Sequence, residues 1–181
     1  MAKNLIIYFS REGENYWNGS IKVLDKGNTE IVAEYIQKAV GGDLFKVETV
    51  KAYAADYYQC AEEAKEELNA QARPELKRYL DTLNGYDNVF VCGPCWWGTF
   101  PMAMFTQLER LNFAGKRVFA VMTHEGNGLA NCEQDLKRIC VGATLGKGIS
   151  VHGAEVARAE RGVEAWAKSV LGHHKPRNSK Q

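Results

Sequence analysis

The stretch Val89-Phe90-Val91-Cys92-Gly93-Pro94-Cys95-Trp96-Trp97-Gly98-Thr99-Phe100-Pro101 combines a strand, an aromatic loop and the start of a helix. Its first residues form a short apolar run, enough for one strand buried on both faces. The loop then carries two adjacent tryptophans, and Thr-x-Pro marks the start of the next helix. Open α/β sheets bind ligands at the carboxyl ends of their strands. The stretch therefore predicts a site there for a flat aromatic ligand with a polar rim.

Short apolar runs alternate with amphipathic helical patterns on both sides of this stretch. Strands are predicted at residues 5–9, 44–47, 89–92, 116–123 and 144–151, and helices around residues 32–40, 61–72, 104–111, 129–140 and 163–171. Pro74 predicts the start of one more helix, with Leu76, Leu80 and Leu83 on one face. This alternation predicts an α/β fold, a parallel sheet with helices on both faces. Right-handed crossovers favour a doubly wound five-stranded sheet of order 2-1-3-4-5.

The composition is that of one ordinary globular domain. The chain has 181 residues and a formal net charge of +1, which gives no electrostatic basis for binding nucleic acid. It lacks an apolar run of the roughly 20 residues that a membrane helix needs, so we expect no membrane insertion. The five cysteines do not form a secreted disulfide pattern, which favours a cytoplasmic location. We expect one domain over residues 1–172 and a basic, disordered tail over residues 173–181; a homodimer remains open.

In the order 2-1-3-4-5, the loops after strands one and three meet in space. The loop after strand one begins Ser10-Arg11 and ends Gly27-Asn28-Thr29, immediately before the first helix. Hydroxyl groups, a glycine and free N–H groups at a helix N-terminus can form an anion site. The plainer interpretation is that Asn28 or Thr29 caps the helix, and both interpretations can hold together.

A third loop follows strand four and reads Thr123-His124-Glu125-Gly126-Asn127-Gly128. Its glycines would let the backbone approach a ligand closely, although an ordinary helix-entry turn has a similar pattern. The first strand–helix turn has no G-x-G-x-x-G motif, which argues against a dinucleotide. An aromatic mononucleotide with one terminal phosphate fits these loops.

These three loops resemble those of the flavodoxin family. Tyr8-Phe9-Ser10-Arg11…Gly27-Asn28-Thr29 resembles its phosphate loop. Pro94-x-Trp96-Trp97-Gly98-Thr99-x-Pro101 and Thr123-His124-Glu125-Gly126-x-Gly128 resemble its two flavin-ring loops. The resemblance extends to about Leu171 and implies a flavodoxin-like fold with noncovalent FMN. The implied site residues are Ser10, Arg11, Asn28 and Thr29 near the phosphate, and Pro94, Cys95, Trp96, Trp97, Gly98, Thr99, Thr123, His124, Glu125, Gly126 and Gly128 near the ring.

One departure from the family pattern is the segment Glu12–Lys26, which separates Ser10 from Asn28 where flavodoxins have a compact loop. Its Tyr16 and Trp17 could cover the flavin or form a partner surface. A surface excursion packed on itself is the alternative.

Other motifs carry weaker predictions. Cys92-Gly93-Pro94-Cys95 is the tetrapeptide that thioredoxins use for dithiol exchange, but its place at a central strand favours Cys92 as a small buried residue. No Cys/His set has zinc spacing, so we expect no metal site. His124 has no catalytic partner visible in the sequence, and the catalytic residues stay unassigned.

Two functions fit the resemblance. The first is an electron carrier that holds FMN and docks on a redox partner protein. The second is an oxidoreductase that uses NAD(P)H to reduce quinones or similar small acceptors. Near-neutral charge weakens the carrier interpretation, because carriers of this type are usually strongly acidic. The carrier nevertheless remains the preferred one.

Overall fold

A six-stranded parallel sheet forms the centre of the computed structural model, which describes residues 2–172. The predicted tail at 173–181 lies outside the described residues. The strands are β1 (Asn4–Tyr8), β4 (Asp43–Lys46), β5 (Asn88–Pro94), β6 (Arg117–His124), β7 (Thr144–Leu145) and β8 (Ile149–His152). Their order is β4-β1-β5-β6-β7, and β8 also pairs with β6. The predicted order 2-1-3-4-5 is confirmed.

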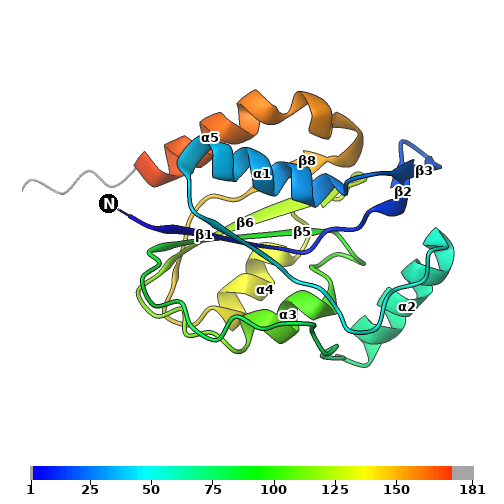
Figure 1. The fold of residues 1–181 in the computed structure, drawn as a ribbon, viewed down its shortest axis with the longest axis horizontal. Coiled ribbons are helices and arrows are strands. Elements are labelled where there is room, and N and C mark those ends of the chain that lie inside the picture. Colours follow the sequence, from blue (N-terminus) through cyan, green and yellow to red (C-terminus); the bar gives the residue numbers. More distant parts are fainter. Residues whose placement is uncertain (1, 173–181) are drawn as a thin grey trace, which may run out of the picture.

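Helices cover both faces of the sheet (Figure 1). On one face lie α1 (Asn28–Val40) and α5 (Glu160–Gly172), and on the other lie α3 (Met102–Leu108) and α4 (Cys132–Ile139). Strand β1 alternates between the two layers, as the period of a strand requires. Leu5 and Ile7 pack in the core on the α3 and α4 side, and Ile6 and Tyr8 pack on the α1 and α5 side.

The predicted fifth strand at 144–151 is divided in two. β7 pairs with Arg117 and Val118 of β6, and β8 resumes pairing at Val121. Three residues, 146–148, therefore lie opposite two residues of β6, and this extra residue interrupts the strand. The chain passes so close to β6 that a Cβ on Gly146 would lie 2.2 Å from the Phe119 ring.

The helix predicted from Pro74 is wrong. Residues 70–87 contain turns and an isolated bridge between Thr49 and Leu76, but no helix. The Gln107 side chain donates to the Leu80 carbonyl (2.7 Å) and accepts from the Leu80 N–H (2.8 Å). These bonds replace the partners that a helix would have supplied, while Leu76 and Leu83 still reach the core.

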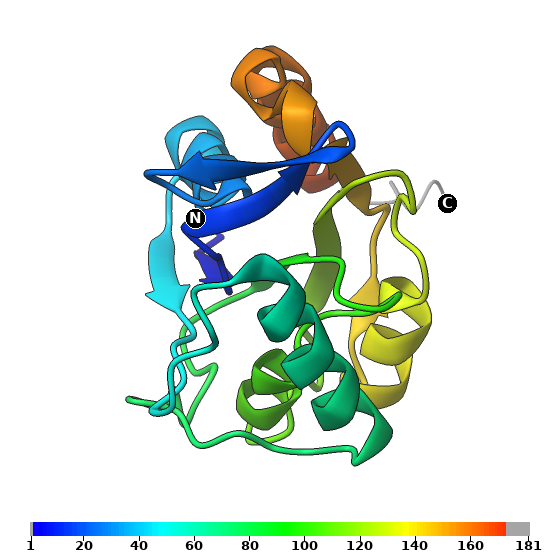
Figure 2. The same cartoon turned by 90° about the vertical axis from the view of Figure 1, so that its right-hand side faces the viewer.

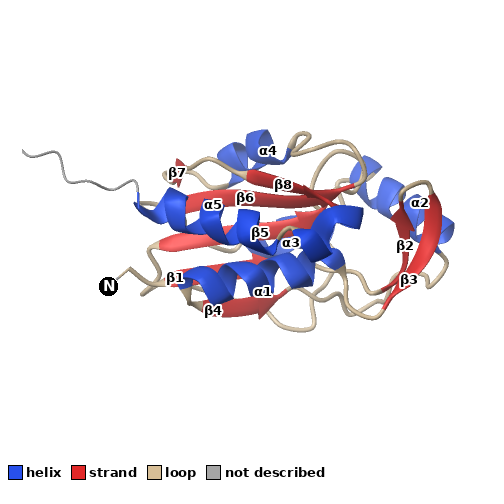
Figure 3. Ribbon diagram, turned by 90° about the horizontal axis from the view of Figure 1, so that it is seen from above, coloured by secondary structure: helices blue, strands red, loops and turns tan. Residues whose placement is uncertain are grey.

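Two elements stand at the carboxyl end of the sheet (Figures 2 and 3). The segment Glu12–Lys26 contains a β-hairpin of β2 (Gly13–Trp17) and β3 (Ser20–Leu24), and α2 (Tyr57–Asn69) lies across from it. Asn18 and Gly19 both have positive φ (47° and 90°), as the tight two-residue turn of a hairpin requires. A 3₁₀ helix (Gly153–Arg158) follows β8. Within residues 2–172 we find no helix that is both long and apolar enough to cross a membrane.

Candidate functional site

The three predicted loops meet at the carboxyl ends of β1, β5 and β6, where they line two adjoining cavities. The first, of about 210 Å³, lies beside the N-terminus of α1. The second, of about 320 Å³, lies between the tryptophan loop and α2. Six residues line both: Arg11, Asn15, Tyr57, Cys95, Trp96 and Asn127. The two cavities therefore adjoin, and together they form the candidate site.

The N-terminus of α1 is capped by a residue far away in the sequence. Gly27 occupies the N-cap position without a side chain, and the Glu30 N–H donates to Ser10 Oγ at 3.0 Å. A Cβ on Gly27 would lie 2.1 Å from that oxygen, so only glycine fits there. The interpretation of Asn28 or Thr29 as the cap is therefore corrected, because Ser10 supplies the capping oxygen.

Asn28 and Thr29, both predicted to lie near the phosphate, have different surroundings. Thr29 is only 2% exposed, and its Oγ1 is 2.8 Å from Thr123 Oγ1. This hydroxyl pair joins the first loop to the third. Asn28 lines the smaller cavity, and a Cβ on Gly153 would lie 2.8 Å from Asn28 Nδ2. The Asn28 side chain and the backbone N–H groups of Asn28 and Thr29 are therefore the donors available to an anion, because the Glu30 N–H already donates to Ser10.

Glu125 joins the third loop to the hairpin. Its Oε2 accepts from the Asn18 N–H at 3.2 Å and lies 3.3 Å from His152 Nε2. The turn of the hairpin thus reaches across the end of the candidate site. Tyr16 of β2 also lines the smaller cavity, whereas Trp17 lies under the Lys22 ammonium group.

His124 is held in a neutral state by its surroundings. Its Nδ1 accepts from the Gly126 N–H at 2.8 Å, and its ring stacks on His152 with centroids 5.7 Å apart. Burial, together with the neighbouring His152, lowers the pKa of His124, while Glu125 opposes this shift. His124 and Asn28 line the same cavity, where a neutral imidazole can act as a hydrogen-bonding group but adds no positive charge.

The two tryptophans have different surroundings. Trp96 packs edge-to-face on Phe9 and Tyr53, with ring centroids 5.0 Å apart in both pairs. Trp97 is 51% exposed and has a positive φ of 56°. Its Nε1 donates to the Ala61 carbonyl of α2 at 2.9 Å. Trp96 is thus an inner wall of the site, and Trp97 joins the site to the surface.

Gly98 and Thr99 complete this loop in different ways. Gly98 lines the larger cavity with φ of 89°, and its carbonyl accepts from the Asn131 N–H at 2.9 Å. Thr99 is buried and donates to Asp135 at 2.5 Å, away from both cavities. Thr99 therefore ties the loop to α4 and does not line the site.

Arg11 connects the loop after β1 to the segment before α2. Its Nε donates to the Glu14 carbonyl at 3.0 Å, and its Nη2 donates to the carbonyls of Ala54 (2.9 Å) and Ala55 (3.1 Å). Its donors are therefore largely used within the protein, although the side chain lines both cavities.

Cys92 and Cys95 lie in different layers. Cys92 is fully buried in the core on the α1 side, where burial raises its pKa. Cys95 packs on the opposite core and faces the site, and burial raises its pKa as well. Alternation along β5 thus separates two side chains that a dithiol would bring together. The interpretation of Cys92 as a buried strand residue is confirmed. Within residues 2–172 no group of His, Cys, Asp or Glu is arranged to hold a metal ion.

Most, but not all, of the residues expected in the site line the two cavities. Those that do are Arg11, Asn28, Thr29, Pro94, Cys95, Trp96, Trp97, Gly98, Thr123, His124 and Glu125. Ser10, Thr99, Gly126 and Gly128 shape the loops from outside the cavity walls.

Most of the lining residues that the sequence did not predict lie on α2 and on the hairpin. They are Asn15, Tyr57, Cys60, Ala61 and Ala64, together with Gly153. The Glu-, Lys- and Ala-rich composition of residues 61–72 predicted an exposed helix, but not its start at Tyr57 or its position over the site.

Comparisons with known proteins identify the family. Residues 22–170 match the family model described as Flavodoxin. None of the curated proteins matches the chain. A candidate flavoprotein of Bacteroides uniformis is 28% identical over 92% of this chain and 98% of its own, with a TM-score of 0.73. One from Bacteroides eggerthii is 25% identical over 94% and 99% of the two chains, also with a TM-score of 0.73.

A flavoprotein from Lactobacillus acidophilus, solved in complex with FMN, is 20% identical over 87% of this chain and 98% of its own. Its TM-score of 0.59 supports the fold. With a family model matched over most of its length, this chain belongs to the flavodoxin family.

Proposed function

We propose that this protein is an FMN-binding flavoprotein that transfers electrons to or from a redox partner protein. Membership of the flavodoxin family supports FMN as the cofactor, as the sequence predicted. The observation that carries the proposal is the pair of adjoining cavities, with the N-terminus of a helix at one and tryptophan and tyrosine side chains lining the other.

The residues present fit this cofactor. Gly27 has no side chain that would collide with Ser10 where the backbone turns into α1, and Asn28 and Thr29 at the start of α1 line the smaller cavity. These groups would hold the phosphate. Trp96 and Gly98 would lie along the isoalloxazine ring on one side, with Tyr57 and Cys60 of α2 on the other. The hydrogen bond from Trp97 to Ala61 would close one edge of this slot.

Bound FMN supplies redox chemistry in steps of one or two electrons. The protein would orient the ring between α2 and the tryptophan loop and exclude water from both ring faces. Trp97 would then provide a half-exposed aromatic contact between the ring cavity and a docked protein.

A flavin ring bound between α2 and the tryptophan loop would have both faces covered, and this favours an electron carrier over an NAD(P)H-dependent reductase. Hydride transfer requires the donor carbon within about 3–3.5 Å of the ring, and therefore an open ring face. Helix α2 lines the cavity opposite the tryptophan loop, so a ring bound between them would have both faces covered. Electron transfer has no such requirement, because the partner does not have to touch the ring face. We propose a cytoplasmic location on the basis of cysteine usage.

An anaerobic reduction experiment tests the proposal. Protein loaded with FMN is mixed with excess NADPH, and the visible flavin absorption is followed; dithionite serves as the control reductant. We expect dithionite to bleach the flavin and NADPH to leave it oxidised for many minutes. Rapid bleaching by NADPH, followed by reoxidation with a quinone, would instead establish the reductase.

A further inference from the structure

A carboxylate lies at the end of the candidate site where the phosphate of FMN is expected. Gly153 lies beside both side chains concerned: a Cβ on it would be 2.6 Å from Glu125 Oε1 and 2.8 Å from Asn28 Nδ2. Glu125 and Asn28 also line the same cavity. A phosphate monoester is largely a dianion at neutral pH, so a phosphate held by Asn28 would have a second negative group close to it.

The same carboxylate holds the turn of the hairpin. Glu125 Oε2 accepts from the Asn18 N–H at 3.2 Å and lies 3.3 Å from His152 Nε2. Asn18 is exposed, so its N–H is protected from solvent by this bond and not by burial. Hydrogen bonds to a charged acceptor are about twice as strong as those between neutral groups. The charge of Glu125 therefore helps to keep the turn in place.

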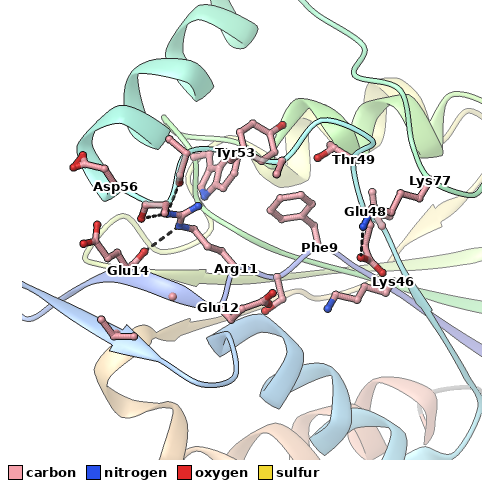
Figure 4. A pocket seen from close by; sticks show the side chains of 18 residues that line it. Phe9, Arg11, Glu12, Glu14, Lys46, Glu48, Thr49, Tyr53, Asp56 and Lys77 are labelled. Carbon is pink, nitrogen blue, oxygen red and sulfur yellow. Dashed lines mark hydrogen bonds and ion pairs between the residues drawn. The ribbon is translucent and has the colours of Figure 1, made fainter.

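Other bonds fix the base of the hairpin. Arg11 donates to the carbonyl of Glu14 and to two carbonyls of the segment before α2 (Figure 4). Glu14 Oε2 accepts from the Tyr57 N–H at 2.6 Å. The turn can therefore shift while the base of the hairpin stays attached to α2.

These contacts couple the phosphate to the hairpin turn through Glu125. A bound dianion repels the carboxylate and so weakens its hold on the Asn18 N–H. Coupling between two equilibria is reciprocal, so the contact between Glu125 and the turn must weaken phosphate binding by the same factor. A flavin without a phosphate has no charge at this end and would leave the contact unchanged.

We propose that Glu125 is a specificity-determining residue, which lowers the preference of the site for phosphorylated over unphosphorylated flavin and links phosphate binding to release of the hairpin turn. The position of the phosphate in this proposal rests on the proposed function. Removal of the carboxylate should therefore raise the affinity for FMN and leave the affinity for riboflavin unchanged.

Three variants of the full chain test the preference, with both affinities measured by quenching of flavin fluorescence in flavin-free protein. Glu125→Gln removes the charge and keeps the shape of the side chain, and Glu125→Ala removes the carboxylate altogether. Glu155→Gln is the matched control for the loss of one charge. Glu155 is an exposed residue that pairs with Arg158 at 3.4 Å and lines neither cavity of the site.

We expect both Glu125 variants to bind FMN at least about threefold more tightly, with riboflavin affinity within twofold of the parent. Glu155→Gln should leave both affinities within twofold. An unchanged or smaller preference for FMN over riboflavin, in either Glu125 variant that still binds riboflavin, would overturn the proposal.

Hydrogen exchange at the Asn18 N–H tests the link to the hairpin in the parent protein, where no variant has to fold. FMN should make this exchange at least about threefold faster than riboflavin does. Equal rates with the two flavins would overturn the proposal, and the proposed function would stand because FMN still binds.

Inorganic phosphate tests Glu125 without any flavin. It should speed exchange at the Asn18 N–H of the flavin-free chain, compared with chloride at equal ionic strength. This result in a chain that does not bind FMN would contradict the proposed function and leave the role of Glu125 standing. Equal exchange in phosphate and chloride, at phosphate concentrations that compete with FMN, would overturn the role of Glu125.

Discussion

Gly27 is the residue at which the loop after β1 and the start of α1 come closest together. A Cβ there would lie 2.1 Å from Ser10 Oγ and 2.7 Å from the Arg11 carbonyl oxygen, so neither the side chain nor the backbone could keep its place. We expect Gly27→Ala to lower the free energy of unfolding by about 1–3 kcal/mol, as overpacking does. It should also weaken FMN binding, because the displaced atoms build the phosphate loop.

Gly162 provides a control for the same substitution. It lies within α5, and a Cβ there would meet nothing within 4 Å. Gly162→Ala should raise the free energy of unfolding by about 0.5–1 kcal/mol, because alanine loses less conformational freedom in a helix. Urea unfolding of both variants measures the pair. Equal effects at the two positions would mean that Gly27 is not in a crowded place.

Trp96 and Trp97 are expected to differ in their contribution to stability. Trp96 packs on two aromatic rings, so Trp96→Ala should cost about 3 kcal/mol, at the lower end for a tryptophan in a core. Trp97 is half exposed, and Trp97→Ala should cost about 1 kcal/mol. Chemical unfolding of the two variants checks this; similar losses would contradict the assignment of Trp96 as the inner wall.

His124 makes stability depend on pH. Its folded pKa is lowered by burial and by His152, against the opposing effect of Glu125, so the unfolded chain takes up the proton first as pH falls. The free energy of unfolding should therefore decrease as pH falls through about 6.5, the ordinary value for histidine. His124→Gln should lose this part of the decrease. Unfolding at pH 7.5 and 5.5 measures it, and an unchanged pH dependence in the variant would contradict the assignment.

At the scale of elements, Arg11 joins the hairpin to the segment before α2. Arg11→Met removes its bonds to the carbonyls of Glu14, Ala54 and Ala55 and should lower the free energy of unfolding by about 2 kcal/mol. Arg11→Lys should recover only part of this loss, since an ammonium group cannot reproduce the planar fork of guanidinium. Hydrogen exchange should become faster at residues 52–57. Unchanged protection there would show that other contacts hold this segment.

The elements that could be predicted from the sequence are those with strong local patterns. The apolar runs of β1, β5 and β6 and the stripes of α1 and α5 predicted their positions and the sheet order. The failures depend on contacts distant in sequence. The Gln107 amide takes the hydrogen bonds of Leu80, and no local signal at Pro74 reveals that partner.

The residues of the candidate site also fall into two groups, those that the sequence predicted and those that depend on contacts distant in the sequence. Loops at the carboxyl ends of strands follow from topology, so Asn28, Trp96 and His124 could be expected in one place. The walls from α2 and the hairpin could not be expected, because their position depends on tertiary contacts. One is the bond from the Tyr57 N–H to Glu14 at 2.6 Å, which joins residues 43 positions apart. The Ser10 cap of α1 is of the same kind.

At the scale of the whole molecule, the candidate site lies at the carboxyl edge of the sheet, and the hairpin and α2 stand over it. We propose that the N-terminus of α1 and the aromatic slot beside α2 together bind FMN through both its phosphate and its ring. Asn28 is the best position for a test of the phosphate end, because it faces the cavity whereas the Thr29 hydroxyl is buried.

Titration of flavin-free protein with FMN and with riboflavin, followed by quenching of flavin fluorescence, measures both parts of this binding. We expect saturable quenching by FMN with one site per chain, and riboflavin affinity at least tenfold weaker because riboflavin lacks the phosphate. Asn28→Asp should weaken FMN binding at least tenfold, about 1.4 kcal/mol, and affect riboflavin binding much less. Absence of quenching by FMN, or equal affinities for the two flavins in both proteins, would show that FMN is not held in this way.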